Sequence, residues 1–159
     1  MNQNSQLLKL IDVLRAKNLK LGLAESCSGG LLSATITEVP GVSDFYTGGI
    51  VGYSNSIKQS ILGVKEETLK KFGAVSAETA QEMAKGVCEK LNADCAIAIT
   101  GIAGPSGGTP EKPVGTVFFA IKGPDFEMAK KEIFTGTRIE IQKLSVICSI
   151  EYLLNQLLR

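Results

Sequence analysis

The chain has 159 residues, of which 44% are hydrophobic and 21% are charged, and its formal net charge is +1. This length and composition predict one globular domain, residues 1–159, and the near-neutral charge argues against a nucleic-acid surface or a polybasic membrane patch. The sequence shows no long apolar span and no signal peptide, so we expect a cytoplasmic protein.

The sequence contains no histidine. A Ser-His-Asp triad, a Cys-His pair and a histidine zinc site are therefore excluded within this chain, and we expect neither a metal nor a cofactor. The four cysteines, Cys27, Cys88, Cys95 and Cys148, form no C-x-x-C pair. We expect reduced thiols, three of them buried in the core. A serine nucleophile would need a lysine, a tyrosine or a carboxylate as its base.

Hydrophobic spacing and turn residues predict alternating helices and strands in the first half of the chain. These are a helix over 5–17, a strand over 19–24, a helix from a glycine turn to about 38, a loop over 42–47, a strand over 48–53, a helix over 56–62 capped by Asn55, a helix over 65–71, and a longer helix capped by Ser76.

The second half is richer in strands. We expect strands over 93–100, 114–121 and 126–134, a glycine-rich loop over 101–113, and a final helix that turns Ile141, Leu144, Ile147, Cys148 and Leu154 inward. The strand over 126–134 should lie at an edge, because it carries charged residues. The loop over 101–113 is too short for a crossover, so the next strand should run antiparallel. The predicted fold is α/β: a three-layer α/β/α domain with a mixed, mostly parallel five-stranded sheet.

The segment Ala24-Glu25-Ser26-Cys27-Ser28-Gly29-Gly30 joins the first predicted strand to a helix. The glycines allow a tight turn, and the first turn of a helix presents unpaired N–H groups. Ser26 is placed where a nucleophile would face a developing negative charge. The alternative is that Ser28 only caps the helix and the glycines only turn the chain.

Tyr53 and Lys58 belong with Ser26 if the first two strands are parallel. Lys58 would then lie in the first turn of the helix after Asn55, where the helix dipole and burial both lower the pKa of its amine. A neutral amine could serve as a base, whereas Glu25, if it is near, would raise that pKa. The alternatives are a solvated lysine, a half-buried strand tyrosine, and a loop over 101–113 that is only a flexible surface excursion.

Several segments in order resemble the C-terminal domain of the competence/damage-inducible CinA family, whose stand-alone form resembles the nicotinamide-nucleotide amidohydrolases (NMN deamidases). They are 24–30, Tyr53-Ser54-Asn55 with Lys58, Gly73-Ala74-Val75-Ser76, Thr100-Gly101-Ile102-Ala103-Gly104-Pro105 and Gly115-Thr116-Val117. The resemblance implies that Ser26, Tyr53 and Lys58 match the family's catalytic serine, tyrosine and lysine. Two positions depart from the family pattern: Ser28 stands where threonine is common, and Thr137 stands where aspartate usually precedes the arginine.

The resemblance also implies a reaction in NAD salvage: hydrolysis of the carboxamide of nicotinamide mononucleotide to nicotinic acid mononucleotide and ammonia. Ser26 would attack while Lys58 takes its proton, directly or through Tyr53. The oxyanion would be held by N–H groups of Cys27, Ser28, Gly29 and Gly30, and the phosphate by Gly101, Ile102, Ala103, Gly104, Ser106 and Arg138.

Two other readings remain open: a nucleotide-binding module without turnover, and a thiol nucleophile at Cys27 that would lack a histidine to pair with. The expected partner is a small-molecule nucleotide, with no nucleic acid and no membrane. We also expect a homo-oligomer, a dimer or larger.

Overall fold

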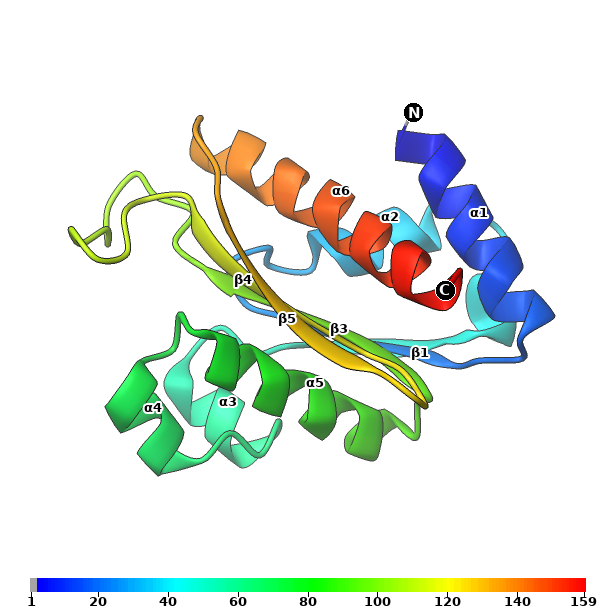
Figure 1. Cartoon of the computed structure of the whole chain (residues 1–159), viewed down its shortest axis with the longest axis horizontal. Coiled ribbons are helices and arrows are strands. Elements are labelled where there is room, and N and C mark those ends of the chain that lie inside the picture. The colour runs from blue at the N-terminus through cyan, green and yellow to red at the C-terminus, as the bar shows by residue number, and fades with distance from the viewer. Residues whose placement is uncertain (1–2) are drawn as a thin grey trace.

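One mixed sheet of five strands lies at the centre of the domain (Figure 1). The structure, a computed structural model, describes residues 3–159. The strands are β1 (Leu21–Glu25), β2 (Tyr46–Val51), β3 (Cys95–Gly101), β4 (Thr116–Lys122) and β5 (Glu127–Ile133), in the spatial order β2-β1-β3-β4-β5. β1 runs parallel to β2 and β3, whereas β4 is antiparallel to β3 and β5. The mixed α/β sheet and the antiparallel strand after the loop are therefore confirmed.

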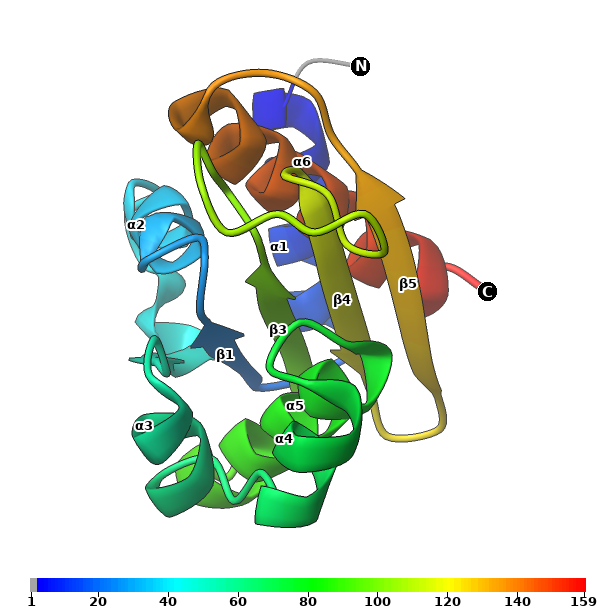
Figure 2. The ribbon, with the colours of Figure 1, turned by 90° about the vertical axis from the view of Figure 1, so that its left-hand side faces the viewer.

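Helices cover both faces of this sheet, which makes the three predicted layers (Figures 1 and 2). One face carries α1 (Gln3–Ala16), α2 (Leu31–Thr37) and α6 (Arg138–Leu157). The other carries α3 (Asn55–Ser60), α4 (Glu66–Phe72) and α5 (Ala77–Leu91). A short turn of helix, η1 (Val42–Asp44), precedes β2. Among residues 3–159, none of the helices combines the length and the apolarity needed to cross a bilayer.

The two faces of the sheet are packed differently, because side chains alternate along each strand. On β3, Ile97 and Ile99 belong to the apolar cluster shared with α1, α2 and α6, whereas Ala96 and Ala98 belong to the cluster shared with α5. Large side chains therefore fill the space under α6, and small ones leave room for the backbone of α5 close to the sheet. The strand β1, which lies between β2 and β3 in the sheet, is buried along its whole length.

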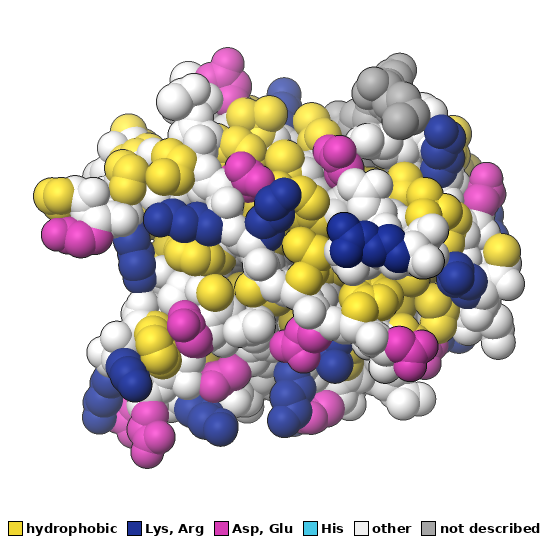
Figure 3. Space-filling view, viewed as in Figure 1, with side chains coloured by type: hydrophobic (Ala, Val, Ile, Leu, Met, Phe, Trp, Pro, Cys, Tyr) yellow, Lys and Arg dark blue, Asp and Glu magenta, His cyan; other side chains and the backbone are white. Residues whose placement is uncertain are grey.

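β5 forms one edge of the sheet, as predicted. It carries charges of both signs, and Figure 3 shows Lys, Arg, Asp and Glu side chains scattered among apolar ones over this face. The residues before β2 were predicted less well. The expected loop over 42–47 contains η1 and the start of β2, because β2 begins at Tyr46, where it pairs with Leu21 of the neighbouring strand.

The cap of α3 also differs from the prediction. Ser54 is the N-cap, since its Oγ accepts the N–H of Ile57, and Asn55 is already the first helical residue. The cap of α5 is Ser76, as predicted.

The inward face of α6 contains two serines that the sequence pattern did not place there. Ser145 and Ser149 are buried, whereas Leu144, Ile147 and Cys148 are only partly buried. A serine hydroxyl can be buried on a helix when it donates to a carbonyl of the preceding turn. Ser145 Oγ donates to the Ile141 carbonyl in this way, and Ser149 Oγ to that of Val146. The predicted inward positions Ile141 and Leu154 are buried.

All four cysteines are free thiols, as predicted. The expectation that three of them are buried in the core is wrong by one residue: Cys27 and Cys95 are buried, but Cys88 and Cys148 are only partly buried. Cys95 lies on the central strand β3, whereas Cys88 and Cys148 lie on helices that face solvent on one side.

Candidate active site

A cavity of about 330 Å³ opens at the carboxyl ends of the parallel strands, where α/β folds commonly bind ligands. Its walls come from the turn after β1, the segment after β2 together with α3, the segment before α5, the loop after β3 and the start of α6. The residues that line it are Ser26, Cys27, Tyr53, Asn55, Lys58, Ala74, Val75, Thr100, Gly101, Ile102, Ala103, Gly104, Ser106, Gly107 and Arg138. The structure thus brings most of the predicted site residues together; Ser28, Gly29 and Gly30 lie on the adjoining turn, outside this lining.

Ser26 and Lys58 form a hydrogen-bonded pair inside this cavity. Lys58 Nζ donates to Ser26 Oγ at 3.0 Å and to the backbone carbonyl of Tyr53 at 3.1 Å. Only 2% of Lys58 and 7% of Ser26 are exposed. Burial lowers the pKa of the Lys58 amine, and the Cys27 thiol group acts in the opposite direction. A lysine that loses its proton more readily and touches a serine hydroxyl is suited to act as its base.

Position in the helix does not explain the lowered pKa of Lys58. Ser54 caps α3, so Lys58 is the fourth helical residue and lies one turn from the N-terminus, not in the first-turn position expected from an Asn55 cap. Its amine is bonded to Ser26 Oγ and the Tyr53 carbonyl, and removal from water is the cause of the lowered pKa. Glu25 was expected to raise the pKa of Lys58 if it lay nearby. It does not, because its carboxylate faces a different partner.

That partner is the N-terminus of α2. The Glu25 side chain is fully buried and accepts the backbone N–H groups of Gly30, Leu32 and Ser33 at 3.1, 3.1 and 2.8 Å. It also accepts the Ser33 hydroxyl at 2.9 Å. A carboxylate there satisfies the unpaired donors and the positive end of the helix dipole. The protein's own side chain therefore occupies the anion site that the sequence suggested for a ligand.

The turn itself leaves two N–H groups for an oxyanion. Ser26 N–H donates to the Ile99 carbonyl, and Gly29 N–H donates to the Ser26 carbonyl. With Gly30 bound to Glu25, only Cys27 and Ser28 have N–H groups in this turn without an acceptor among residues 3–159. The predicted set of four oxyanion donors is thereby reduced to two.

Ser28 does not cap α2, so the alternative reading of this segment is wrong in that respect. The N-cap is Gly30, with a positive φ of 98° and no side-chain cap. Ser28 Oγ is buried and, among the described residues, is the one buried side-chain polar atom without a hydrogen-bond partner. An unsatisfied buried hydroxyl is unusual in a folded protein.

Arg138 joins two walls of the cavity. Its Nη1 donates to the Gly104 carbonyl at 2.8 Å, and its Nη2 donates to the Tyr53 hydroxyl at 3.1 Å. Tyr53 is 61% exposed, and only its backbone carbonyl is bonded to Lys58. The geometry therefore favours direct proton transfer between Ser26 and Lys58 over a relay through the Tyr53 hydroxyl. The β2 strand ends at Val51, before Tyr53.

Thr137 stands where the family pattern usually has aspartate, and the structure explains this departure. Thr137 is the N-cap of α6: its Oγ accepts the Glu140 N–H, and the Glu140 carboxylate accepts the Thr137 N–H. Threonine and aspartate both cap helices through a side-chain oxygen. Arg138 is consequently the first residue of a well-capped helix, directed toward the cavity.

The loop after β3 offers fewer free groups than its sequence suggested. Ile102 N–H donates to the Thr116 carbonyl, which leaves the N–H groups of Ala103 and Gly104 as donors for a ligand. A Cβ at Gly101 would lie 2.7 Å from the Thr116 carbonyl oxygen, so that glycine is required for packing against β4. Ser106 and Arg138 also line the cavity.

The Cys27 thiol is poorly suited to act as a nucleophile. It is 5% exposed, and burial raises its pKa to about 12. A thiol with this pKa is protonated at neutral pH, whereas the thiolate is the reactive form.

Two supporting residues were missed by the sequence reasoning. Gln142 on α6 donates from Nε2 to the Cys27 carbonyl at 2.9 Å, and Thr100 donates to the Ala74 carbonyl at 2.7 Å. Gln142 lies 115 positions from Cys27, so no local pattern could reveal the contact. The role of Glu25 at the N-terminus of α2 could have been predicted, because an acidic residue before a helix is a known stabilising arrangement.

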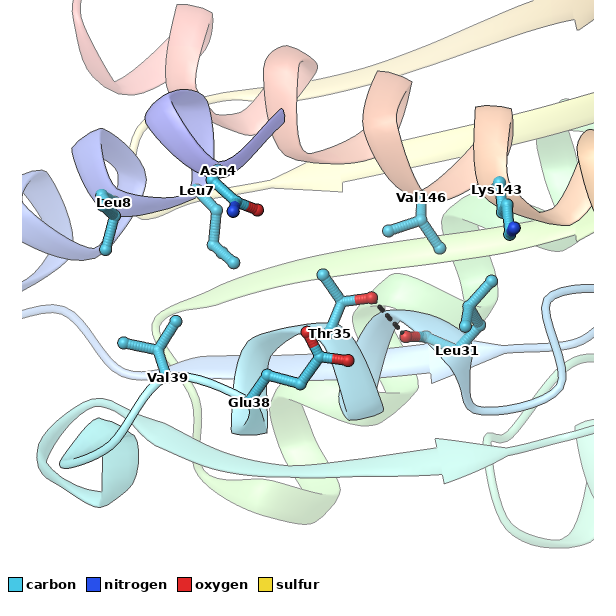
Figure 4. A pocket seen from close by; sticks show the side chains of 9 residues that line it. All are labelled: Asn4, Leu7, Leu8, Leu31, Thr35, Glu38, Val39, Lys143 and Val146. Carbon is cyan, nitrogen blue, oxygen red and sulfur yellow. Dashed lines mark hydrogen bonds between the residues drawn. The ribbon is translucent and has the colours of Figure 1, made fainter. Parts of the chain in front are cut away.

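A larger cavity of about 490 Å³ lies between α1, α2 and α6 (Figure 4). Its lining is Asn4, Leu7, Leu8, Leu31, Thr35, Glu38, Val39, Lys143 and Val146. The Thr35 hydroxyl is used within α2, where it donates to the Leu31 carbonyl. This lining contains no nucleophile paired with a base, so the smaller cavity is the candidate active site despite its size.

The structure is an α/β domain in which a buried lysine, Lys58, is hydrogen-bonded to a serine, Ser26, at the carboxyl ends of the parallel strands. The model of the CinA C-terminal domain family matches residues 4–157, and the chain belongs to this family.

Relatives and solved structures agree with this assignment. A CinA-like protein of Prochlorococcus marinus (strain MIT 9515) is 54% identical over 140 residues, which cover 86% of this chain and 32% of that protein. A CinA-like protein of Thermotoga neapolitana is 47% identical over 144 residues, 91% of this chain and 35% of that protein. The chain thus spans about a third of the length of these curated relatives.

Two crystal structures have the same fold over nearly the whole chain. A CinA superfamily protein from Klebsiella pneumoniae matches with a TM-score of 0.94 and 34% identity, covering 99% of this chain and 98% of that one. A competence/damage-inducible protein from Agrobacterium tumefaciens matches with a TM-score of 0.93 and 39% identity, covering 97% and 96%.

Proposed function

We propose that this chain hydrolyses the carboxamide of nicotinamide mononucleotide, giving nicotinic acid mononucleotide and ammonia. The observation that carries the proposal is the 3.0 Å hydrogen bond from Lys58 Nζ to Ser26 Oγ inside a cavity at the strand ends. The resemblance of the site segments to the nicotinamide-nucleotide amidohydrolases is the reason for choosing this substrate. The reaction would return nicotinamide nucleotides to NAD synthesis.

An amide is a poor electrophile, so its hydrolysis needs an activated nucleophile and a stabilised oxyanion. The Ser26 hydroxyl attacks the carboxamide carbon while the neutral Lys58 amine takes its proton. The pKa of Lys58 is lowered by burial, which favours the neutral form that this step requires. The N–H groups of Cys27 and Ser28 are the donors available for the oxyanion, because the other N–H groups of the turn are already bonded.

Collapse of the tetrahedral intermediate breaks the carbon–nitrogen bond. The Lys58 ammonium gives its proton to the departing nitrogen, which leaves as ammonia, and an ester between Ser26 and the carboxyl group of nicotinic acid mononucleotide remains. Water then attacks the ester while Lys58 accepts a proton, and that proton returns to Ser26 Oγ as the acid departs. Lys58 therefore acts as base and acid in turn, and no other proton carrier is needed.

The nucleotide portion would lie against the loop after β3 and the start of α6. Arg138 and the N–H groups of Ala103 and Gly104 are the cationic and backbone donors there, and Ser106 adds a hydroxyl. Such groups suit a phosphate. Arg138 already bonds Gly104 and Tyr53, so its position is set before a ligand arrives.

The test is to incubate the purified chain with nicotinamide mononucleotide and to measure ammonia and the acid product. Turnover by the wild type and its loss in Ser26→Ala, with unfolding temperature unchanged, is the expected result. Mass spectrometry of quenched wild type should find, on Ser26, an acyl adduct with the mass of nicotinic acid mononucleotide less water. Tight binding of the nucleotide without ammonia release would instead identify a binding module, and retained turnover in Ser26→Ala would exclude the serine mechanism.

A further inference from the structure

The peptide group formed by the Cys27 carbonyl and the Ser28 N–H is held by a contact from a distant helix. Gln142 Nε2 on α6 donates to the Cys27 carbonyl at 2.9 Å. The Ser28 N–H has no acceptor within residues 3–159. The Ser28 hydroxyl does not hold the turn either, because it has no hydrogen-bond partner in the described chain. Gln142 is therefore the contact that sets the orientation of this peptide group.

The orientation of this peptide group decides where the Ser28 N–H points. A trans peptide is planar, and its C=O and N–H point in opposite directions. The Cys27–Ser28 peptide is trans, so the bond to Gln142 directs the Ser28 N–H away from the Gln142 amide. The Ser28 N–H is one of the two donors that the turn leaves for an oxyanion. A hydrogen bond to the carbonyl also polarises the peptide, which makes its N–H a stronger donor.

The other hydrogen bonds of the turn hold different peptide groups. Gly29 N–H donates to the Ser26 carbonyl, and Leu31 N–H donates to the Ser28 carbonyl. Neither bond uses the Cys27 carbonyl or the Ser28 N–H. Without Gln142, rotation of the peptide between Cys27 and Ser28 would cost no hydrogen bond within the described protein, and the Ser28 N–H would no longer have a fixed direction.

The helix that carries Gln142 is itself firmly placed. Thr137 caps α6, and Arg138, four residues before Gln142 and on the same side of the helix, bonds the Gly104 carbonyl and the Tyr53 hydroxyl. Figures 1 and 2 show α6 passing close to α2, which follows the turn. A group that orients a site is most effective on such a rigid element.

We propose that Gln142 is a positioning residue for the oxyanion: its amide holds the Cys27 carbonyl so that the Ser28 N–H is directed at the oxygen that becomes negative when Ser26 attacks. The inference rests on the proposed function for the reaction that it serves. Gln142 is not among the residues that line the cavity, so it acts through the peptide group and not on the substrate. The oxyanion exists in the transition state but not in the bound substrate, so a misdirected donor lowers kcat and leaves KM unchanged.

The experiment compares wild type with Gln142→Met and Gln156→Met. Methionine keeps an unbranched side chain of similar length but donates no hydrogen bond. Gln156 is the matched control, because it is also partly buried on α6 but lies near the opposite end of that helix. Both variants should unfold near the wild-type temperature. If Gln142→Met fails to fold, Gln142→Glu carries the test, because its carboxylate has the same shape and cannot donate at neutral pH.

The expected result is a change in kcat alone. Direct removal of one oxyanion donor costs about 10²- to 10³-fold in kcat, and misdirection of a donor that is still present should cost less. We expect Gln142→Met to lower kcat for nicotinamide mononucleotide by about 10-fold with KM unchanged, and Gln156→Met to match the wild type. A purely structural bond would lower the unfolding temperature of Gln142→Met and leave kcat at the wild-type value.

A second reaction separates this inference from the proposed substrate. p-Nitrophenyl acetate acylates an activated serine without any nucleotide, and its reaction also passes through an oxyanion. The p-nitrophenol release that depends on Ser26, taken as the difference between wild type and Ser26→Ala, should be slower in Gln142→Met and unchanged in Gln156→Met. Reaction of the wild type with the ester but not with the nucleotide would refute the proposed function alone, and the ester would then decide the role of Gln142.

NMR reports on the peptide group itself. The carbonyl carbon of Cys27 and the amide nitrogen of Ser28 both sense a hydrogen bond to that carbonyl, so their signals should shift in Gln142→Met and stay in place in Gln156→Met. Equal kcat in the two variants, a raised KM in place of a lowered kcat, or unmoved signals would overturn the inference. A wild type in which Ser26 reacts with neither compound would overturn both the inference and the proposed function.

Discussion

Replacement of Lys58 by methionine removes the amine while keeping an unbranched side chain of similar length. If Lys58 is the base and then the acid, its loss should lower kcat by about 10²- to 10⁴-fold, the usual contribution of a positioned general base. The side chain is 2% exposed, so the methionine should remain in the same apolar space. The variant should therefore fold normally while turning over slowly.

Stability provides an independent check of the same group. The pKa of Lys58 is lower in the folded chain than in the unfolded one, where it is about 10.4. Between these two values the unfolded chain binds more protons, so the free energy of unfolding of the wild type rises with pH. Below the lowered pKa the folded chain must hold a buried ammonium group, so the stability gained at higher pH is lost. Lys58→Met should not show this dependence.

The activity of the wild type should rise with pH through an apparent pKa below about 10.4, since only the neutral amine can accept the Ser26 proton. Lys58→Arg should be nearly inactive, because guanidinium stays protonated. The assay is the initial rate of ammonia release across pH for wild type, Lys58→Met and Lys58→Arg, together with their unfolding curves. In Lys58→Ala, added small primary amines should restore part of the rate. Near-normal turnover by Lys58→Arg would refute the reasoning, and the base would then be sought at Tyr53 or a carboxylate.

Three further predictions follow from the site. Cys27→Ala should keep most activity, because the buried thiol is protonated at neutral pH; a loss as deep as that of Ser26→Ala in the same assay would restore the thiol as nucleophile. Glu25→Gln should lower the free energy of unfolding by about 2 kcal/mol or more, the value of charged hydrogen bonds that an amide cannot replace. Glu38→Gln at the exposed end of α2 is its control in denaturant titrations, and equal loss in both variants would argue against the role of the Glu25 carboxylate. Turnover should survive chelators, because a chain without histidine has few ligands for a catalytic transition metal; inactivation reversed by added metal would contradict this.

The order and direction of the strands were predictable, because the position of each strand depends on features of the nearby sequence. The loop over 101–113 is too short for a crossover, which correctly predicts that β4 reverses, and the charges of β5 correctly place it at an edge. The proximity of Ser26 and Lys58 followed in the same way, since parallel strands bring their carboxyl ends to one side of a sheet.

The hydrogen bonds of the turn were not predictable, because they depend on competition between groups that the sequence does not rank. Gly29 and Gly30 are predicted oxyanion donors, but their N–H groups are bonded to the Ser26 carbonyl and to Glu25. The contact of Gln142 with Cys27 depends on how α6 packs across the sheet. The buried serines of α6 were not among the predicted inward residues, because a pattern of apolar residues cannot show that a hydroxyl is satisfied within its own helix.

Ser26 and Lys58 are held by parts of the domain that differ in robustness. Ser26 follows β1, a fully buried strand between two neighbours, whereas Lys58 belongs to a six-residue helix whose other residues are mostly exposed. Helices of this length are not stable alone, and such segments open at lower free energy than central strands. On heating, we therefore expect α3 to separate from the sheet first, so that turnover ceases while the domain is still folded. The temperature limit of activity would then be set by α3.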